Sequence, residues 1–269
     1  MVLKKTKVLS VVFLFIAQAG ATQANESAIE RLFQLSGNTA AIHSLSKTLE
    51  HQLSPDTLTA EVGDPAFAAA LSHSMLSNFN PALFHSKTKK SVRESLTTSE
   101  INKILTWFDT PLGQRVAVAN QADLFQISLR IEAGERPQVS AERSRMIETL
   151  DKVLMGSDRN IQLAIDAGAV MGHSMMSAMG IPASLSDIRP AVKMQVMAEK
   201  EKMVEEFHAT IGFLYESLSD DDFRQLIAAQ SDPEHTIFND AIWNGLSEAF
   251  YQASASLGNT LTGELNGGI

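Results

Sequence analysis

The amino-acid sequence predicts an all-α protein, and three observations support this. Apolar residues recur at intervals of three and four, which places them on one face of a helix. Ile101, Ile104, Leu105 and Phe108 follow this spacing, and the same spacing continues over several turns within residues 196–218. No segment shows the alternation of β-branched and polar residues that is typical of a strand, and the chain has two Tyr and two Trp residues.

The first 24 residues have the organisation of a signal peptide. A lysine-rich start leads into an apolar run over residues 8–19, which is too short to span a bilayer. Small residues follow, and cleavage after either Ala21 or Ala24 fits them. We therefore expect an exported, soluble protein located in the periplasm.

The net charge and the absence of cysteine exclude several classes of function and of stabilisation. Removal of the leader takes away Lys4, Lys5 and Lys7 and no acid, so the net charge moves from −9 to −12. Such an acidic protein is a poor candidate for binding nucleic acid or an anionic membrane surface. Without cysteine there is no lipid-anchored cysteine and no disulfide, so the hydrophobic core must stabilise the fold. We expect no membrane insertion once the signal is removed.

The mature chain contains a weak internal repeat, in which residues 94–105 align with residues 216–227. The apolar positions of the two segments coincide, and several of their residues are identical. Each segment also begins with a polar pair at the spacing of a capping box, namely Thr97 with Glu100 and Ser219 with Asp222.

The repeat extends toward the N-terminus and suggests two related modules. Residues 29–32 resemble residues 147–150, and each is followed by a glycine and a polar residue, Gly37-Asn38 and Gly156-Ser157. We predict two helical-bundle modules in tandem, over residues 25–137 and 138–257. The alternative is one continuous bundle with chance similarity. Residues 258–269 are rich in Gly, Asn and Thr, and we expect them to be a disordered tail.

Residues 105–116, Leu-Thr-Trp-Phe-Asp-Thr-Pro-Leu-Gly-Gln-Arg-Val, predict a corner between two helices. The first helix is expected to end just before Thr110. Thr110 can cap the next helix, and Pro111 can occupy its first position, where a missing N–H has no cost. Gly113 has no Cβ, so the two helices can approach each other closely.

Residues 97–116, TTSEINKILTWFDTPLGQRV, resemble the signature of a bacterial exported family known as domain of unknown function 2059. Members of that family carry a helix, an aromatic pair and a short Ser/Thr-Pro-x-Gly-Gln turn. The close match covers residues 96–120. A degenerate second copy over residues 218–238 keeps a cap and a proline but lacks the aromatic pair, the glycine and the glutamine. The resemblance implies an α-helical secreted module and no particular reaction.

Two interpretations of the corner residues follow. In the first, Trp107, Phe108, Pro111, Gly113 and Gln114 build the corner and pack it. In the second, they form a binding patch for a partner around an exposed Trp107, because an aromatic side chain at a helix end can anchor an interface.

A methionine-rich segment offers a possible metal site. Met171, His173, Met175 and Met179 lie within nine residues, and thioether and imidazole groups are ligands that suit Cu(I). The three methionines share one helical face, whereas His173 lies well round the helix from them. The alternative is that these methionines fill irregular gaps in a helical core.

No complete catalytic set is present in the sequence. Residues 172–176, Gly-His-Ser-Met-Met, come close to the nucleophile elbow of α/β-hydrolases, but Met176 replaces the last glycine and the flanks predict helix. The seven histidines lack zinc spacing, and the acidic run of residues 220–222 lacks calcium-loop spacing. We therefore predict no catalytic residue and no cofactor.

These observations favour a non-enzymatic binding or interaction protein of the cell envelope. The expected partner is another envelope protein, and no nucleic acid is expected. A periplasmic copper-binding protein that uses the methionine-rich helix is the first alternative. An enzyme whose polar groups come together only in three dimensions is the second.

Overall fold

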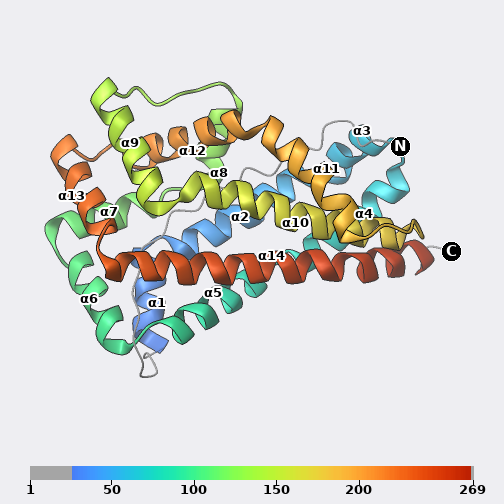
Figure 1. Ribbon diagram of the computed structural model, residues 1–269, viewed down its shortest axis with the longest axis horizontal. Coiled ribbons are helices and arrows are strands. Elements are labelled where there is room, and N and C mark those ends of the chain that lie inside the picture. Colours follow the sequence, from blue (N-terminus) through green and yellow to red (C-terminus); the bar gives the residue numbers. More distant parts are fainter. Residues whose placement is uncertain (1–25, 268–269) are drawn as a thin grey trace.

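The computed structural model describes residues 26–267, and within this range the chain forms helices and no strands, which confirms the all-α fold (Figure 1). The helices are α1 (Glu26–Leu35), α2 (Asn38–Gln52), α3 (Pro55–Val62), α4 (Pro65–Asn78), α5 (Pro81–Ser95), α6 (Thr98–Phe108), α7 (Pro111–Ala119), α8 (Leu124–Glu132), α9 (Ala141–Leu154), α10 (Gly156–Ala178), α11 (Leu185–Ala198), α12 (Lys200–Leu214), α13 (Asp220–Gln230) and α14 (Pro233–Gly267).

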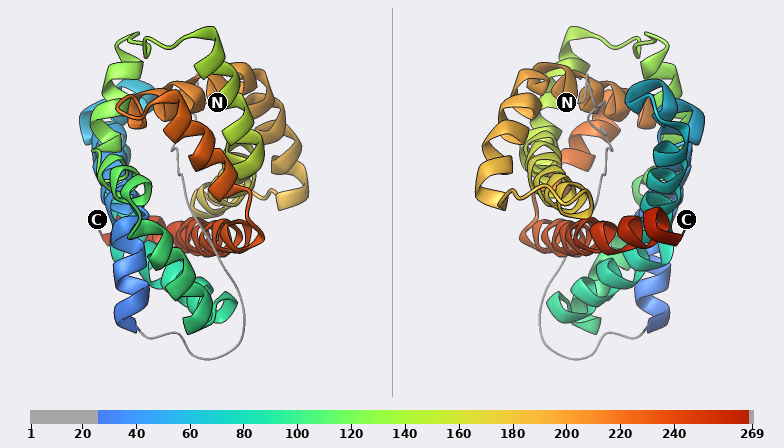
Figure 2. Two further views of the ribbon diagram at one scale, coloured as in Figure 1. Left: turned by 90° about the vertical axis from the view of Figure 1, so that its left-hand side faces the viewer. Right: turned by 90° about the vertical axis from the view of Figure 1, so that its right-hand side faces the viewer.

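The central element is α14, which runs nearly the length of the molecule (Figure 1). Two other helices, α5 and α10, pack extensively along it, and α4 packs against it as well. Figures 1 and 2 show that α10 and α14 lie side by side, and Figure 1 shows that they run in the same direction. Since α4 and α5 come from the first half of the chain and α10 from the second, α14 connects the two halves.

One main hydrophobic core crosses the boundary predicted near Pro137. Phe33 and Phe108 of the first half and Phe223 and Phe238 of the second are all buried within it. The Phe33 and Phe238 rings meet edge to face, with centroids 6.4 Å apart. The two segments therefore share a core, while their division into two related modules stays a prediction about sequence repetition.

Two helix starts agree with the expected caps. Thr97 and Glu100 form both hydrogen bonds of a capping box at the start of α6. At the start of α13, Ser219 accepts a hydrogen bond from the Asp222 N–H, but the Asp222 carboxylate pairs with Arg115 of α7 at 2.5 Å. The same carboxylate also receives hydrogen bonds from Ser219, so the ion pair to α7 adds to the local cap.

The connections α1–α2 and α9–α10 both pass through a residue with positive φ. Gly37 has φ +78°, and Met155, rather than the neighbouring Gly156, has φ +50°. Gly156 is needed for a different reason, because a Cβ there would lie 2.1 Å from the Phe207 ring. Met155 thus precedes α10 as Gly37 precedes α2, and Gly156 is the first residue of α10.

The predicted disordered tail is wrong for residues 258–267, because α14 continues through Gly267. Leu257 and Leu261 are fully buried, and Thr260 accepts a hydrogen bond from Asn78 of α4. Apolar residues at helical spacing thus outweigh a composition rich in Gly, Asn and Thr.

The predicted signal peptide, with its cleavage positions Ala21 and Ala24, lies outside the described residues. Among the helices of residues 26–267, none combines the length and the apolar character that crossing a membrane requires.

Candidate functional site

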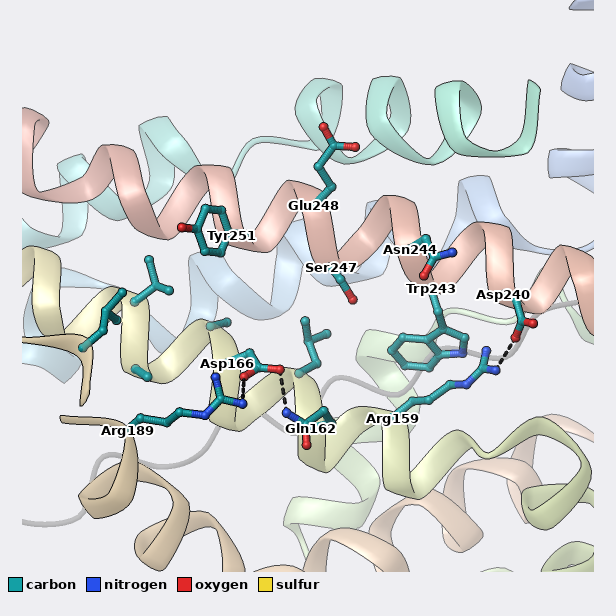
Figure 3. A pocket seen from close by; sticks show the side chains of 15 residues that line it. Arg159, Gln162, Asp166, Arg189, Asp240, Trp243, Asn244, Ser247, Glu248 and Tyr251 are labelled. Carbon is teal, nitrogen blue, oxygen red and sulfur yellow. Dashed lines mark hydrogen bonds and ion pairs between the residues drawn. The ribbon is translucent and has the colours of Figure 1, made fainter. Parts of the chain in front are cut away.

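A furrow of about 790 Å³ runs between α10 and α14 (Figure 3). Each wall is a single helix face, because its residues are spaced by three and four. From α10 come Arg159, Gln162, Leu163, Asp166, Ala167 and Val170, and from α14 come Asp240, Trp243, Asn244, Ser247, Glu248 and Tyr251.

The furrow has an apolar floor and an open rim. Trp243 and Val170 are buried, and Leu163 is half-buried, so aromatic and aliphatic surface forms the floor. Ser247 and Tyr251 are exposed on α14, and Tyr251 retains 57 % of its accessible surface. Tyrosine and tryptophan side chains are enriched at surfaces that bind other proteins.

Two ion pairs frame this floor (Figure 3). Arg159 of α10 pairs with Asp240 of α14 and so joins the two walls. Farther along α10, Arg189 Nη2 of α11 lies 2.5 Å from Asp166 Oδ1, and Gln162 Nε2 donates to Asp166 Oδ2 at 2.6 Å. The charges on the walls are thus matched within the protein.

Two polar atoms in the α10 wall make no hydrogen bond within the described residues. Arg159 Nη1 is buried and makes no hydrogen bond within the described part of the chain. Asp166 Oδ1 contacts Arg189 without the geometry of a hydrogen bond. A buried donor without a partner costs about 1–3 kcal/mol, and a bound ligand or an ordered water can supply the missing partner.

Close packing of α11 on α10 shapes one side of the furrow. A Cβ at Gly168 would lie 3.0 Å from Val192 Cγ1, and a Cβ at Gly172 would lie 3.2 Å from Ile188 Cγ2. These glycines let the two helices approach closely, which brings Leu185 and Arg189 of α11 to the furrow.

The polar groups of the furrow are paired with charges or isolated from one another. Its hydroxyl groups belong to Ser247 and Tyr251, and no histidine is among its lining residues. The carboxylates of Asp166 and Asp240 are held by arginines rather than placed beside a hydroxyl. General-base activation of a nucleophile requires such a contact.

The predicted patch around Trp107 is only partly open. Trp107 is half-buried and packs against the main core. Its ring meets Phe108 and His235 edge to face, at centroid distances of 5.0 Å and 5.5 Å. Phe108 is fully buried. A binding role for this patch stays a prediction.

The other predicted patch residues build the corner. Thr110 caps α7, and Pro111 is at its start, as the sequence predicts. A Cβ at Gly113 would lie 2.1 Å from the Trp107 carbonyl oxygen, so only glycine fits there. Gln114 Nε2 donates to the Asp109 carbonyl across the turn at 3.2 Å. The corner interpretation accounts for all of these contacts.

The four predicted copper ligands have different surroundings. Met171 and Met175 are half-buried and pack against the main core, whereas Met179 is exposed at the end of α10. His173 Nδ1 lies 3.0 Å from the Ala183 carbonyl oxygen, which ties α10 to the loop before α11. These contacts give no support for a shared metal, and the copper site stays a prediction.

A Ser, a His and an Asp also meet away from the furrow. Asp151 Oδ2 accepts hydrogen bonds from Ser157 Oγ at 2.7 Å and from His208 Nε2 at 2.9 Å, and Asp151 Oδ1 accepts one from the Ser157 N–H. Burial alone would raise the pKa of Asp151, but these hydrogen bonds outweigh burial and lower it. Both side chains bond to the carboxylate rather than to each other, so the group caps α10 and ties it to α12.

Sequence reasoning missed the furrow residues. The signal that could have revealed them is the spacing of Trp243, Asn244, Ser247 and Tyr251, which places polar and aromatic residues on one face of α14. That face could not be distinguished from an ordinary exposed face, because its partner α10 lies about 80 residues earlier in the chain.

Comparison with known proteins gives no family assignment. No family model matches the chain, and neither a curated protein nor a solved structure matches it.

Proposed function

We propose that the mature chain is an exported, non-enzymatic binding protein of the bacterial cell envelope, and that it holds its partner in the furrow between α10 and α14. The observation that carries the proposal is the furrow itself, which combines an apolar floor, the exposed Tyr251 and the buried, unsatisfied Arg159 Nη1. Export is supported by the leader of residues 1–24, and membership of the domain of unknown function 2059 family by residues 97–116.

Site-specific photo-cross-linking in a bacterium that exports the protein tests this function. A photoreactive phenylalanine derivative would replace Ser247, which is exposed in the furrow, or Asn102, which is exposed on α6. We expect a discrete cross-linked protein adduct from position 247 and none of that mass from position 102. No adduct from position 247, or the same adducts from both positions, would contradict the proposal.

A further inference from the structure

The walls of the furrow have the geometry that accepts a helix. Two helices run in the same direction, and their lining residues repeat the same spacing of three and four. From Asp240 to Tyr251 the wall on α14 spans roughly 16 Å, or about three helical turns. An amphipathic helix places its apolar residues at this spacing and can pack them into the groove between two helices.

Other modes of peptide binding fit less well. Addition of a strand requires a free sheet edge, and residues 26–267 contain no strand. Asn244, Ser247 and Tyr251 are exposed along the rim, so the furrow is open toward solvent as a groove for a helix must be.

The charges on the α14 rim indicate the sign of the charge that a partner should carry. In the Arg159–Asp240 pair the carboxylate side chain is 47 % exposed and the guanidinium side chain 21 %. The Lys87–Glu248 pair has the same two values, again with the carboxylate more exposed. The α14 rim therefore presents carboxylates to solvent while their cations are withdrawn. On the opposite side of the furrow Arg189 is more exposed than its partner Asp166, so the acidic character belongs to the α14 side.

The part of the chain around the furrow also has a net negative charge. Acidic residues outnumber basic ones by about two to one in residues 138–269, which include both walls of the furrow. Such a surface attracts a cationic partner at long range and disfavours an anionic one.

Resting on the function proposed above, we infer that the occupant of the furrow is an amphipathic helix of a partner protein, with apolar residues on one face and basic residues on its flanks. The apolar face packs on Leu163, Leu185 and Tyr251, which are accessible above the buried Trp243. The basic flanks lie near Asp240 and Glu248.

The test uses Trp243 as a reporter. In the Trp107→Phe variant Trp243 is the single tryptophan, because the chain has two. The probes are three synthetic peptides of about 14 residues. The first has leucines at helical spacing and lysines elsewhere, the second replaces every lysine with glutamate, and the third has the composition of the first with leucine and lysine alternating.

We expect the first peptide to change the Trp243 emission and to bind at least tenfold more tightly than the other two. Ser247→Lys, which places bulk and positive charge in the furrow, should weaken its binding at least tenfold. A matched variant controls for folding and net charge. Asn259→Lys, on the exposed surface of α14 beyond the furrow, adds the same charge and should change the binding less than twofold.

The outcomes separate this inference from the proposed function. Equal binding of the lysine and glutamate peptides overturns the basic partner, and equal binding of the alternating peptide overturns the helix. Cross-linking from position 247 without binding of any peptide overturns the partner class and leaves the proposed function standing. If position 247 gives no cross-linked adduct and no peptide binds, the inference and the proposed function are both overturned.

Discussion

At the scale of single residues, His235 shows how burial acts on a titratable group. Its imidazole is buried against Trp107, and both ring nitrogens lack a hydrogen bond within the described residues. Burial lowers the pKa of His235 to about 4, although the nearby carboxylates of Asp232 and Glu234 act in the opposite direction. The folded protein therefore keeps this side chain neutral in mildly acidic solution.

We predict that the free energy of unfolding falls as the pH drops from about 6.5 to about 4, because the unfolded chain binds a proton at His235 and the folded chain does not. The shift corresponds to about 3 kcal/mol. Urea unfolding at neutral pH and near pH 4.5 should show that His235→Leu has lost most of this dependence. The exposed His43 provides the control, and His43→Leu should behave like wild type. Equal pH dependence in wild type and His235→Leu would contradict the prediction.

Tyr215 connects the two halves through one buried hydrogen bond. Its hydroxyl donates to Asn120 Oδ1 at 2.9 Å, and burial raises its pKa far above the usual value. Asn120 Nδ2 in turn donates to the Leu35 carbonyl at 3.2 Å, so the bond links α12 to the ends of α7 and α1.

Tyr215→Phe should lower the free energy of unfolding by about 1–2 kcal/mol, because Asn120 Oδ1 is left buried without its donor. Urea unfolding at neutral pH measures the change. Tyr251 is the second tyrosine of the chain and is mostly exposed, so Tyr251→Phe should change stability by less than about 0.5 kcal/mol. Similar losses in both variants would exclude a specific role for the Tyr215 bond.

At the scale of helices, the α9–α10 connection contains strain that the α1–α2 connection avoids. Met155 has φ +50°, where Gly37 has φ +78° in the equivalent connection. A side chain in this region costs about 1–2 kcal/mol, whereas glycine adopts it freely. The Met155 side chain is exposed and contributes little to the core.

Met155→Gly should therefore raise the free energy of unfolding by about 0.5–1 kcal/mol. Met194 is an equally suitable control, because it is exposed in the interior of α11. There the same substitution should lower stability by about 1 kcal/mol, since glycine disfavours the helix. Thermal or urea unfolding distinguishes the two signs, and a loss at both positions would show that Met155 is not strained.

At the scale of the whole molecule, the shared core predicts cooperative unfolding. Trp107 lies in the first half and Trp243 in the second, and both contact or belong to the main core. The single-tryptophan variants Trp107→Phe and Trp243→Phe should each give one urea transition that coincides with the transition measured by circular dichroism for the same variant. A tryptophan transition separated from the helical signal would show that the halves unfold independently.

Local chemistry made several elements predictable. Thr97, Glu100, Thr110 and Pro111 mark helix starts through bonds to neighbouring residues, so their roles could be inferred without knowing the fold. The tail was not predictable from composition, because the burial of Leu261 depends on other helices that cover that side of α14.

The amino-acid sequence by itself determined the all-α class, the capped corner after Trp107 and the acidic charge, because these depend on residues within a few turns of one another or on composition alone. Only the tertiary structure decided the shared core, the half-buried state of Trp107 and the furrow. These depend on helices such as α5, α10 and α14, which are far apart in the chain and pack together because each buries an apolar face against the others.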